Sequence, residues 1–318
     1  MSYKKLEKRR ELVRGEWAVV VTGFGEIDLS DTFECGQAFR YECVSREAGY
    51  VEYMTVVGEE LITVGQRERG ELIFYGMDEE TVDGLALPYF SADTDFTLVR
   101  EDVLGRTDSE WLARAADAAR GIVILRQEPW EALFSFIVSQ NNNIPRIRKI
   151  IRSISYEYGV NIAEKKGLKK CPLGRISGTP CHENCKNCGS CYSFPTAAAV
   201  LERPEGLLPS KPGFRYKYLL DAAERVYDGR TSLSAITEAK SYTNTVTELK
   251  KILGVGDKVA SCVALFGFGN LEAFPIDVWM RRAIDDYFDG KLDPEKLGPY
   301  AGVAQQYIFH YIRNLESK

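Results

Sequence analysis

Short apolar segments separated by turn residues occupy the first quarter of the chain. Runs rich in β-branched and aromatic residues fall at 17–21, 38–43, 50–56, 60–64 and 71–75, with glycine, aspartate or charged positions between them. Segments of this length and composition that follow one another through short turns form neighbouring antiparallel strands. Residues 16–76 therefore predict an antiparallel β-sheet.

From about residue 78 the apolar positions take on helical spacing. One face of a helix over 129–139 is formed by residues at i, i+3, i+4 and i+7, namely Trp130, Leu133, Phe134 and Ile137. Pro129 suits the first turn of this helix, and the three asparagines at 141–143 end it. Asn143 then caps the next helix, with Pro145 in its first turn.

The helix after residue 143 carries an isoleucine stripe and a basic cluster. The stripe is Ile147, Ile150, Ile151 and Ile154, and the basic residues are Arg146, Arg148, Lys149 and Arg152. The stripe turns most of the basic residues outward, so the cluster is either a solvated helix face or a phosphate-binding surface. The overall net charge of −5 argues against a general nucleic-acid coat protein, but phosphate binding depends on local clusters of this kind.

These patterns predict an α+β protein. Residues 1–105 are expected to form an N-terminal antiparallel β-sheet domain with a flanking helix, and 106–318 an all-α domain with a Cys-rich insertion at about 165–195. The sequence of 318 residues has no apolar run near the length of a membrane span, and no apolar stretch follows its basic N-terminus. The expected location is the cytoplasm, in association with the nucleoid if the organism is bacterial.

The insertion contains most of the cysteines. Cys171, Cys181, Cys185, Cys188 and Cys191 follow the spacing C-x9-C-x3-C-x2-C-x2-C, with His182 among them. Clustered thiols in a chain without a secretion signal more often bind metal than form disulfides. We expect a structural Zn²⁺ held by the last four cysteines, with Cys171 or His182 as substitute ligands. An iron–sulfur cluster and metal-free redox thiols are the alternatives.

A glycine turn, a lysine and an aspartate form the most informative pattern of the chain. Gly254 and Gly256 flank Val255, Lys258 follows them, and Asp277 opens the next helical segment. A tight glycine turn before a helix can present backbone N–H groups to a phosphate, and a nearby lysine can act as an amine nucleophile. The simpler interpretation is a helix–turn–helix corner with a solvated lysine, in which Asp277 is only a helix cap.

The segments 253–260 and 274–280 resemble the helix-hairpin-helix superfamily of DNA base-excision glycosylases, and within it the 8-oxoguanine DNA glycosylase/AP lyase family. Similar blocks occur in family order at 35–40, 125–129, 134–147, 212–218 and 298–309. Leu253 departs from the family, which usually has proline there. The resemblance implies that Lys258 attacks C1′ of a damaged nucleotide, expels the base and forms a Schiff base without a cofactor. Asp277 would stabilise the developing positive charge, and a lyase step would then break the strand.

The resemblance also implies roles in handling the opposite base. A base in a duplex is reached only after it is flipped out. Asn141 would enter the gap, and Arg146 and Arg215 would donate to the acceptors of the opposite cytosine. Phe214 stands where the family often has tyrosine, and the asparagine run could instead be an ordinary polar loop.

On the lesion side, the Gly36 carbonyl would accept from the N7 hydrogen that distinguishes 8-oxoguanine from guanine. Phe309 and Cys262 would sandwich the flipped ring, and Gln305 would bond its Watson–Crick edge. Simple core packing is the alternative for Phe309 and Cys262. Trp279 stands where the family often has a histidine that contacts phosphate.

The resulting hypothesis is a bifunctional glycosylase/AP lyase that excises 8-oxoguanine opposite cytosine. Its partner would be damaged double-stranded DNA, with no membrane, and the chain would act as a monomer. The alternatives are an alkylated-purine DNA glycosylase of the same superfamily, which generally lacks the lysine, and a non-catalytic DNA-binding module. An iron–sulfur electron carrier is a further alternative that would make the lysine–aspartate pair accidental.

Overall fold

The computed structural model describes residues 6–167 and 189–315. The strands are β1 (Glu7–Val13), β2 (Glu16–Thr22), β3 (Tyr41–Glu47), β4 (Tyr50–Val57), β5 (Glu60–Gln66) and β6 (Glu71–Tyr75). The helices of the first half are α1 (Leu29–Glu34), α2 (Glu79–Thr81), the π-helical turn η1 (Val82–Ala86), α3 (Leu87–Tyr89), α4 (Phe96–Gly105), α5 (Glu110–Ala118), α6 (Pro129–Ser139), α7 (Ile144–Tyr158) and α8 (Ile162–Lys165). Those of the second half are α10 (Ala197–Glu202), η4 (Pro204–Ser210), η5 (Gly213–Arg215), α11 (Tyr216–Tyr227), α12 (Leu233–Ala239), α13 (Tyr242–Leu249), α14 (Asp257–Phe268), α15 (Val278–Tyr287), η6 (Pro294–Tyr300) and α16 (Ala301–Leu315).

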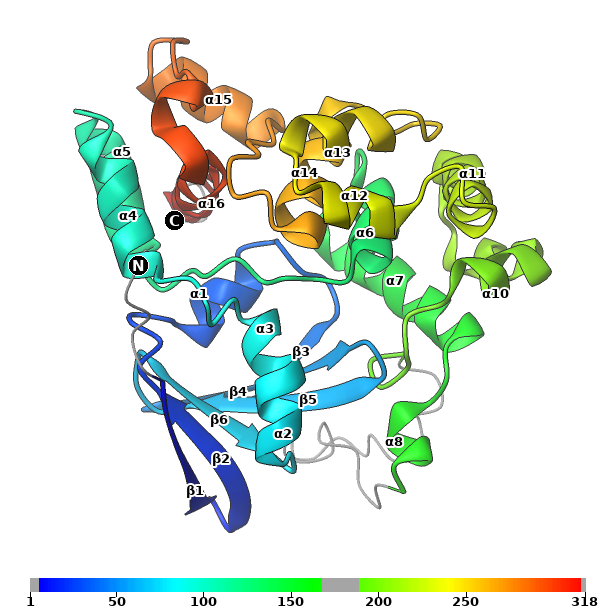
Figure 1. Ribbon diagram of the computed structural model, residues 1–318, viewed down its shortest axis with the longest axis horizontal. Coiled ribbons are helices and arrows are strands. Elements are labelled where there is room, and N and C mark those ends of the chain that lie inside the picture. Colours follow the sequence, from blue (N-terminus) through cyan, green and yellow to red (C-terminus); the bar gives the residue numbers. More distant parts are fainter. Residues whose placement is uncertain (1–5, 168–188, 316–318) are drawn as a thin grey trace.

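The strands form one antiparallel sheet in the order β1-β2-β6-β5-β4-β3, drawn below the helices in Figure 1. Its inner face packs on α1 and on the turns from α2 to α3 around Phe33, Tyr53 and Phe90. The predicted antiparallel sheet is confirmed. Strand β1 lies before the predicted sheet, and the predicted start of a strand at residue 38 is wrong, since residues 38–40 are not in a strand.

Two helices form the centre of the helical part. The side chains of α6 are buried from Ala132 to Val138, and those of α14 from Val259 to Phe266. The two helices pack on each other, so the C-terminal end of α6 meets the N-terminal end of α14. Pro129 lies in the first turn of α6, and Asn143 caps α7 by accepting from the Arg146 N–H at 3.0 Å. The predicted boundaries of these helices are thus confirmed.

Part of the basic cluster on α7 does not face solvent. Arg152 and Arg148 pair with Glu42 of β3 at 2.8 and 3.2 Å, and the Arg148 guanidinium lies 4.1 Å from the centre of the Tyr41 ring. The expectation that most of the basic residues point outward is therefore wrong for these two arginines, since they fasten α7 to the sheet. Arg146 and Lys149 are exposed.

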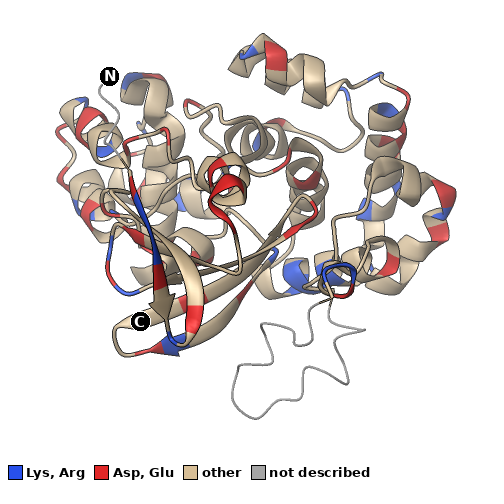
Figure 2. Ribbon diagram, turned by 60° about the horizontal axis from the view of Figure 1, so that its bottom comes forward, with Lys and Arg blue, Asp and Glu red and all other residues tan. Residues whose placement is uncertain are grey.

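The protein has an α+β fold, in which helices follow the sheet along the chain and cover one side of it (Figure 1). The two cores interleave in sequence, because Val99 and Val103 of α4 pack in the helical core, whereas Val123 and Leu125 pack on the sheet. The domain boundary at 105/106 stays a prediction. Acidic and basic positions are spread over both parts (Figure 2). Within the described residues, no helix is both long and apolar enough to span a bilayer.

Candidate active site

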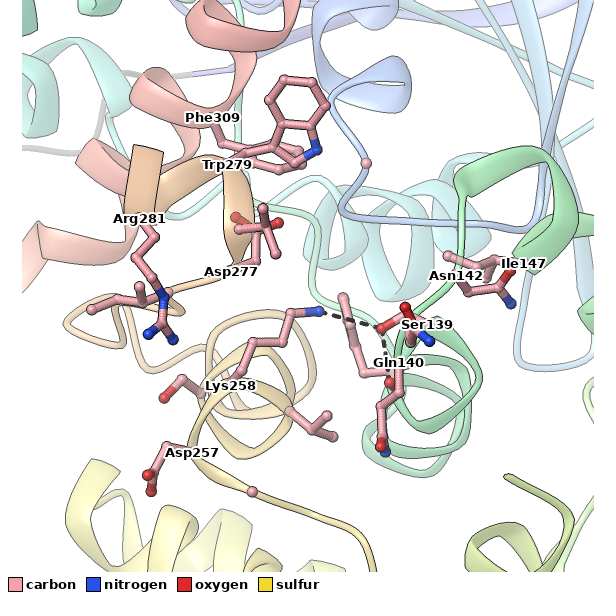
Figure 3. Close-up of a pocket in the computed structure, with 18 of the residues that line it drawn as sticks. Ser139, Gln140, Asn142, Ile147, Asp257, Lys258, Asp277, Trp279, Arg281 and Phe309 are labelled. Carbon is pink, nitrogen blue, oxygen red and sulfur yellow. Dashed lines mark hydrogen bonds between the residues drawn. The ribbon is translucent and has the colours of Figure 1, made fainter. Parts of the chain in front are cut away.

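A cleft of about 1470 Å³ opens between the ends of α6 and α14, the start of α15 and the side of α16. It brings together residues that are far apart in the sequence. Those among the predicted site residues that line it are Gly36, Asn141, Gly254, Gly256, Lys258, Asp277, Trp279 and Phe309. Figure 3 shows Lys258, Asp277, Trp279 and Phe309 around one space.

Lys258 lies in the first turn of α14 and extends its side chain across the cleft (Figure 3). Its Nζ donates to the Ser139 hydroxyl at 3.3 Å and lies 5.6 Å from the centre of the Phe136 ring. The Ser139 hydroxyl donates in turn to the Phe136 carbonyl at 2.8 Å. The amine is therefore oriented by a neutral acceptor at the end of α6 and lies close to an aromatic ring.

Asp277 lies on the same side of the cleft, before the first residue of α15 (Figure 3). Its carboxylate caps this helix by accepting from the Met280 N–H at 2.9 Å. No distance of 4.0 Å or less joins the charged atoms of Lys258 and Asp277, both of which the structure describes. The carboxylate is thus fixed by a helix end and does not hold the lysine in an ion pair.

The glycine turn before α14 is fastened to the end of α6. Gly254 has φ +79°, and a Cβ there would lie 2.5 Å from the Tyr218 ring. The Gly254 carbonyl accepts from the Gln140 side chain at 3.1 Å. Gly256 caps α14 without a side-chain hydrogen bond, so the first N–H groups of this helix have no side-chain cap and can receive a phosphate.

Of the residues predicted to read the opposite base, Asn141 lines the cleft and the other three lie beside it. Arg215 is buried and donates to the carbonyls of Gln140, Asn141 and Pro212 at 2.8, 2.9 and 3.1 Å. The pKa of its guanidinium is lowered by burial and then by the nearby charge of Arg146. Asn141 is exposed, with a left-handed φ of +46°. Arg215 therefore fixes the backbone of the asparagine loop.

Phe214 and Arg146 are exposed and do not line the cleft. The Phe214 ring lies 4.5 Å from the Arg215 guanidinium carbon. With Asn141, these side chains gather at one rim, next to the loop that follows α6.

The predicted lesion-recognition residues divide into two groups. Gly36 and Phe309 line the cleft and lie against each other, since a Cβ on Gly36 would be 3.3 Å from the Phe309 ring. Cys262 is 4% exposed and Gln305 is 3% exposed, and both lie within the wall. Burial raises the pKa of the Cys262 thiol, and the side-chain oxygen Oε1 of Gln305 accepts from the Gln306 side-chain amide at 2.7 Å.

Ser139, Arg281 and Arg313 also line the cleft, although no role was predicted for them from the sequence. Ser139 stands directly before the Gln-Asn-Asn-Asn run, and Arg313 follows Phe309 by four residues. Helical spacing from Phe309 could have indicated Arg313. Arg281 carries no comparable signal.

Of the predicted zinc ligands, only Cys191 lies within the described residues. It is buried against Val56 and Ile162, and its carbonyl accepts from the Ile162 N–H at 2.9 Å. Cys171, Cys181, Cys185, Cys188 and His182 lie outside the described residues. Among the described residues, no group of three or more His, Cys, Asp or Glu side chains could hold a metal ion.

Comparisons with known proteins find relatives over most of the chain. Residues 19–133 match the family model for the N-terminal domain of 8-oxoguanine DNA glycosylase. The 8-oxoguanine glycosylase/lyase of Clostridium acetobutylicum, solved in complex with double-stranded DNA containing cytosine opposite 8-oxoG, is 30% identical with a TM-score of 0.80, over 99% of this chain and 100% of that one. The N-glycosylase/DNA lyase OGG1 of Arabidopsis thaliana is 27% identical over 92% of this chain and 80% of its own length. The 3-methyladenine DNA glycosylase of Archaeoglobus fulgidus, 15% identical with a TM-score of 0.64 over 93% of this chain and 98% of that one, shares the fold.

A glycine hairpin that leads into a helix with a lysine in its first turn, beside a helix-capping aspartate, defines a DNA glycosylase of the helix-hairpin-helix class. The chain belongs to the 8-oxoguanine DNA glycosylase/lyase family.

Proposed function

We propose that this protein removes 8-oxoguanine opposite cytosine from duplex DNA and cleaves the resulting abasic site. The chain is a DNA N-glycosylase with AP lyase activity. One observation supports this substrate most directly: the Lys258 amine and the Asp277 carboxylate lie on the same cleft. The glycine turn beside them leads into a helix N-terminus that can bind a DNA phosphate.

In the proposed reaction the uncharged Lys258 nitrogen forms a bond to C1′, and the bond between C1′ and the base breaks. The electron pair of that bond leaves with the base, which takes up a proton. Asp277 stabilises the positive charge that develops on the sugar. Opening of the sugar ring then gives a Schiff base, and loss of a C2′ proton expels the 3′ phosphate by β-elimination.

Recognition of the lesion is proposed to occur between Gly36 and Phe309. The contact between these residues supports it, since a base stacked on Phe309 would have its edge next to the Gly36 backbone. The N7–H of 8-oxoguanine can donate to a carbonyl, whereas N7 of guanine is an acceptor. Gln305 and Cys262 would act from inside the wall, and Trp279 would contact the DNA at the rim.

The opposite cytosine is proposed to meet the rim formed by Asn141, Arg146, Phe214 and Arg215. Arg146 is exposed at this rim, and the buried Arg215 supplies a second set of guanidinium donors, which are directed at the carbonyls of the asparagine loop in the absence of DNA. Two such sets suit the acceptors of cytosine better than the mixed edge of adenine.

Borohydride trapping tests the proposal, on a duplex with one 8-oxoguanine opposite cytosine. We expect a covalent adduct with the native chain and none with Lys258→Gln. Comparable trapping on duplexes with hypoxanthine or methylated purines would favour an alkylated-purine glycosylase. Binding of the duplex without any adduct would indicate a non-catalytic DNA-binding module.

Three further statements are part of the proposal. The chain acts as a monomer, because one duplex bent around one chain requires no symmetry. The Cys-rich insertion binds a structural Zn²⁺ through Cys181, Cys185, Cys188 and Cys191, which metal analysis and the visible spectrum of anaerobically purified protein would distinguish from an iron–sulfur cluster. The protein acts in the cytoplasm, where thiolate ligands stay reduced.

A further inference from the structure

Arg313 lies against both residues that are proposed to receive the lesion base. Its guanidinium carbon is 5.3 Å from the centre of the Phe309 ring. Its Nη1 is 3.5 Å from the position that a Cβ on Gly36 would occupy. The side chain also lines the cleft. A positive charge thus lies over the Phe309 ring and next to the Gly36 backbone.

The spacing along α16 places the Arg313 side chain on the same helix face as Phe309. Gln305, Phe309 and Arg313 are each four residues apart in this helix, so they lie on one face with roughly 6 Å between successive residues. If a base stacks on Phe309, Gln305 and Arg313 are directed at its opposite ends. If Gln305 acts on the Watson–Crick edge from inside the wall, as proposed above, Arg313 is left at the edge of the five-membered ring.

The chemistry of that edge matches an arginine. In 8-oxoguanine the N7 hydrogen and the oxygen on C8 are on bonded neighbouring atoms, so a group that reads one is next to the other. The Gly36 carbonyl can accept from N7–H but cannot bond to the oxygen, which needs a donor. A guanidinium is charged at all relevant pH values and donates strong hydrogen bonds to carbonyl oxygen.

His310 is another titratable group of α16. Its pKa is lowered by burial and then by the charge of Arg313, and its Nε2 is paired with the Asn314 side-chain amide at 2.9 Å. Arg313 is therefore the stable positive charge of this part of the wall.

We propose that Arg313 is a lesion-reading residue whose guanidinium donates to O8 of the flipped 8-oxoguanine, while Gly36 accepts from N7–H. This inference rests on the proposed function, because it assumes that the base enters between Gly36 and Phe309. Together the two residues read both atoms that separate the lesion from guanine.

The test compares two reactions of the same variant. One duplex carries 8-oxoguanine opposite cytosine, and the other carries an abasic site in the same sequence. Arg313→Leu is expected to lower the single-turnover rate of base release about 10- to 100-fold, the usual range for loss of a charge-assisted hydrogen bond. Cleavage of the abasic site should change less than about twofold, because that substrate has no base to read. Arg313→Lys should restore part of the base-release rate.

Replacing the oxygen with sulfur identifies the atom that is read. Sulfur is a weaker acceptor, so the native chain should release 8-oxoguanine faster than 8-thioguanine, and Arg313→Leu should reduce this ratio towards one. Arg281→Leu, which removes another arginine of the cleft, is the matched control and should leave the ratio unchanged.

The remaining outcomes overturn the inference. An equal loss on the 8-oxoguanine and abasic duplexes would mean that Arg313 acts on Lys258, on the DNA backbone or on the fold. An unchanged oxygen-to-sulfur ratio would mean that Arg313 supports the Phe309 ring without reading O8. If the native chain does not act on 8-oxoguanine, both the proposed function and this inference are refuted. If the native chain is active and only the Arg313 results fail, the inference alone is refuted.

Discussion

The Lys258 amine donates to the Ser139 hydroxyl at 3.3 Å, and this bond joins the beginning of α14 to the last residue of α6. The hydroxyl proton of Ser139 is already used on the Phe136 carbonyl, so Ser139 offers a lone pair to the lysine. The next residue, Gln140, bonds the Gly254 carbonyl. Two consecutive side chains at the end of α6 therefore position the nucleophile and the hairpin before it.

Ser139→Ala is expected to slow formation of the Schiff base about 3- to 10-fold, because the amine loses the acceptor that orients it and one hydrogen bond contributes on the order of 1 kcal/mol. Single-turnover borohydride trapping measures this rate. The dissociation constant for lesion DNA should change less than about twofold. Ser139→Thr keeps the hydroxyl and should retain the native rate.

Ser135→Ala is the matched control for Ser139, since Ser135 lies one turn earlier on α6 and is buried. It removes the same atom from the same helix without touching Lys258. Equal slowing by the two alanine variants would indicate a general effect of α6 and would contradict a positioning role for Ser139.

The two glycines of the hairpin should respond differently to alanine. Gly254 has φ +79°, and its Cβ would meet the Tyr218 ring at 2.5 Å. Gly254→Ala is expected to destabilise the protein by about 3 kcal/mol, from left-handed strain and overpacking together. Gly256 has φ −97° and nothing within 4 Å of an added Cβ. Gly256→Ala should leave the free energy of unfolding within about 0.5 kcal/mol of the native value.

Urea unfolding of both variants measures these differences, and DNA binding completes the comparison. Gly256→Ala should bind lesion duplex several-fold more weakly while it stays folded, since a methyl group would stand where a phosphate approaches the first N–H groups of α14. Native affinity of a stable Gly256→Ala protein would show that no phosphate approaches this position.

Helices and strands could be predicted from the sequence where their apolar residues recur at a regular spacing and where capping residues mark their ends. The helix after residue 143 is an example, because Asn143, Pro145 and the isoleucine stripe agree on its start and its buried face. The strand β1 could not be predicted, because its residues 7–11 are all charged. Its pairing with β2 and the ion pairs of Arg9 with Glu71 and of Glu11 with Arg67 stabilise it, and such charges are usual on an edge strand.

The site residues could be predicted only at positions where the sequence resembles the glycosylase family. Lys258, Asp277, Gly36 and Phe309 meet at one cleft, as that resemblance implied. Ser139 and Arg313 needed coordinates, because their roles depend on how α6 and α16 face elements distant in the sequence. The pairing of Arg148 and Arg152 with Glu42 was hidden for the same reason.

Asp257 places a negative charge beside the nucleophile. Its side chain is 83% exposed, lines the cleft and pairs with Lys250. A carboxylate at this helix start competes with a DNA phosphate for the same N–H groups. Asp257→Asn is therefore expected to tighten binding of lesion duplex about 3- to 5-fold at low salt, with a smaller gain at physiological salt because exposed charges are screened.

Fluorescence anisotropy over a range of salt concentrations would measure the effect of Asp257→Asn. Glu59→Gln is the matched control, because Glu59 is also exposed and paired with a lysine, Lys165, but does not line the cleft. The same gain in both variants would point to the change in net charge alone and contradict a local effect of Asp257.

Asp31 of α1 introduces a pH dependence of stability. Burial, and then the charge of Asp28, raise the pKa of the Asp31 carboxyl to about 6 from its usual 3.8. The carboxylate is 3.3 Å from Arg69 and 4.0 Å from His310 of α16.

As pH rises from about 4 to about 6, the unfolded chain loses the Asp31 proton while the folded chain keeps it. The free energy of unfolding should therefore fall across this window and stay constant above it, as far as Asp31 is concerned. Asp31→Asn removes this fall and should be more stable than the native chain at pH 7 by about 3 kcal/mol, and equally stable near pH 4; the raised pKa already includes the attraction to Arg69. Urea unfolding at both pH values would decide the matter. A variant that is less stable than the native chain at pH 7 would mean that the Arg69 pair outweighs the cost of the buried charge.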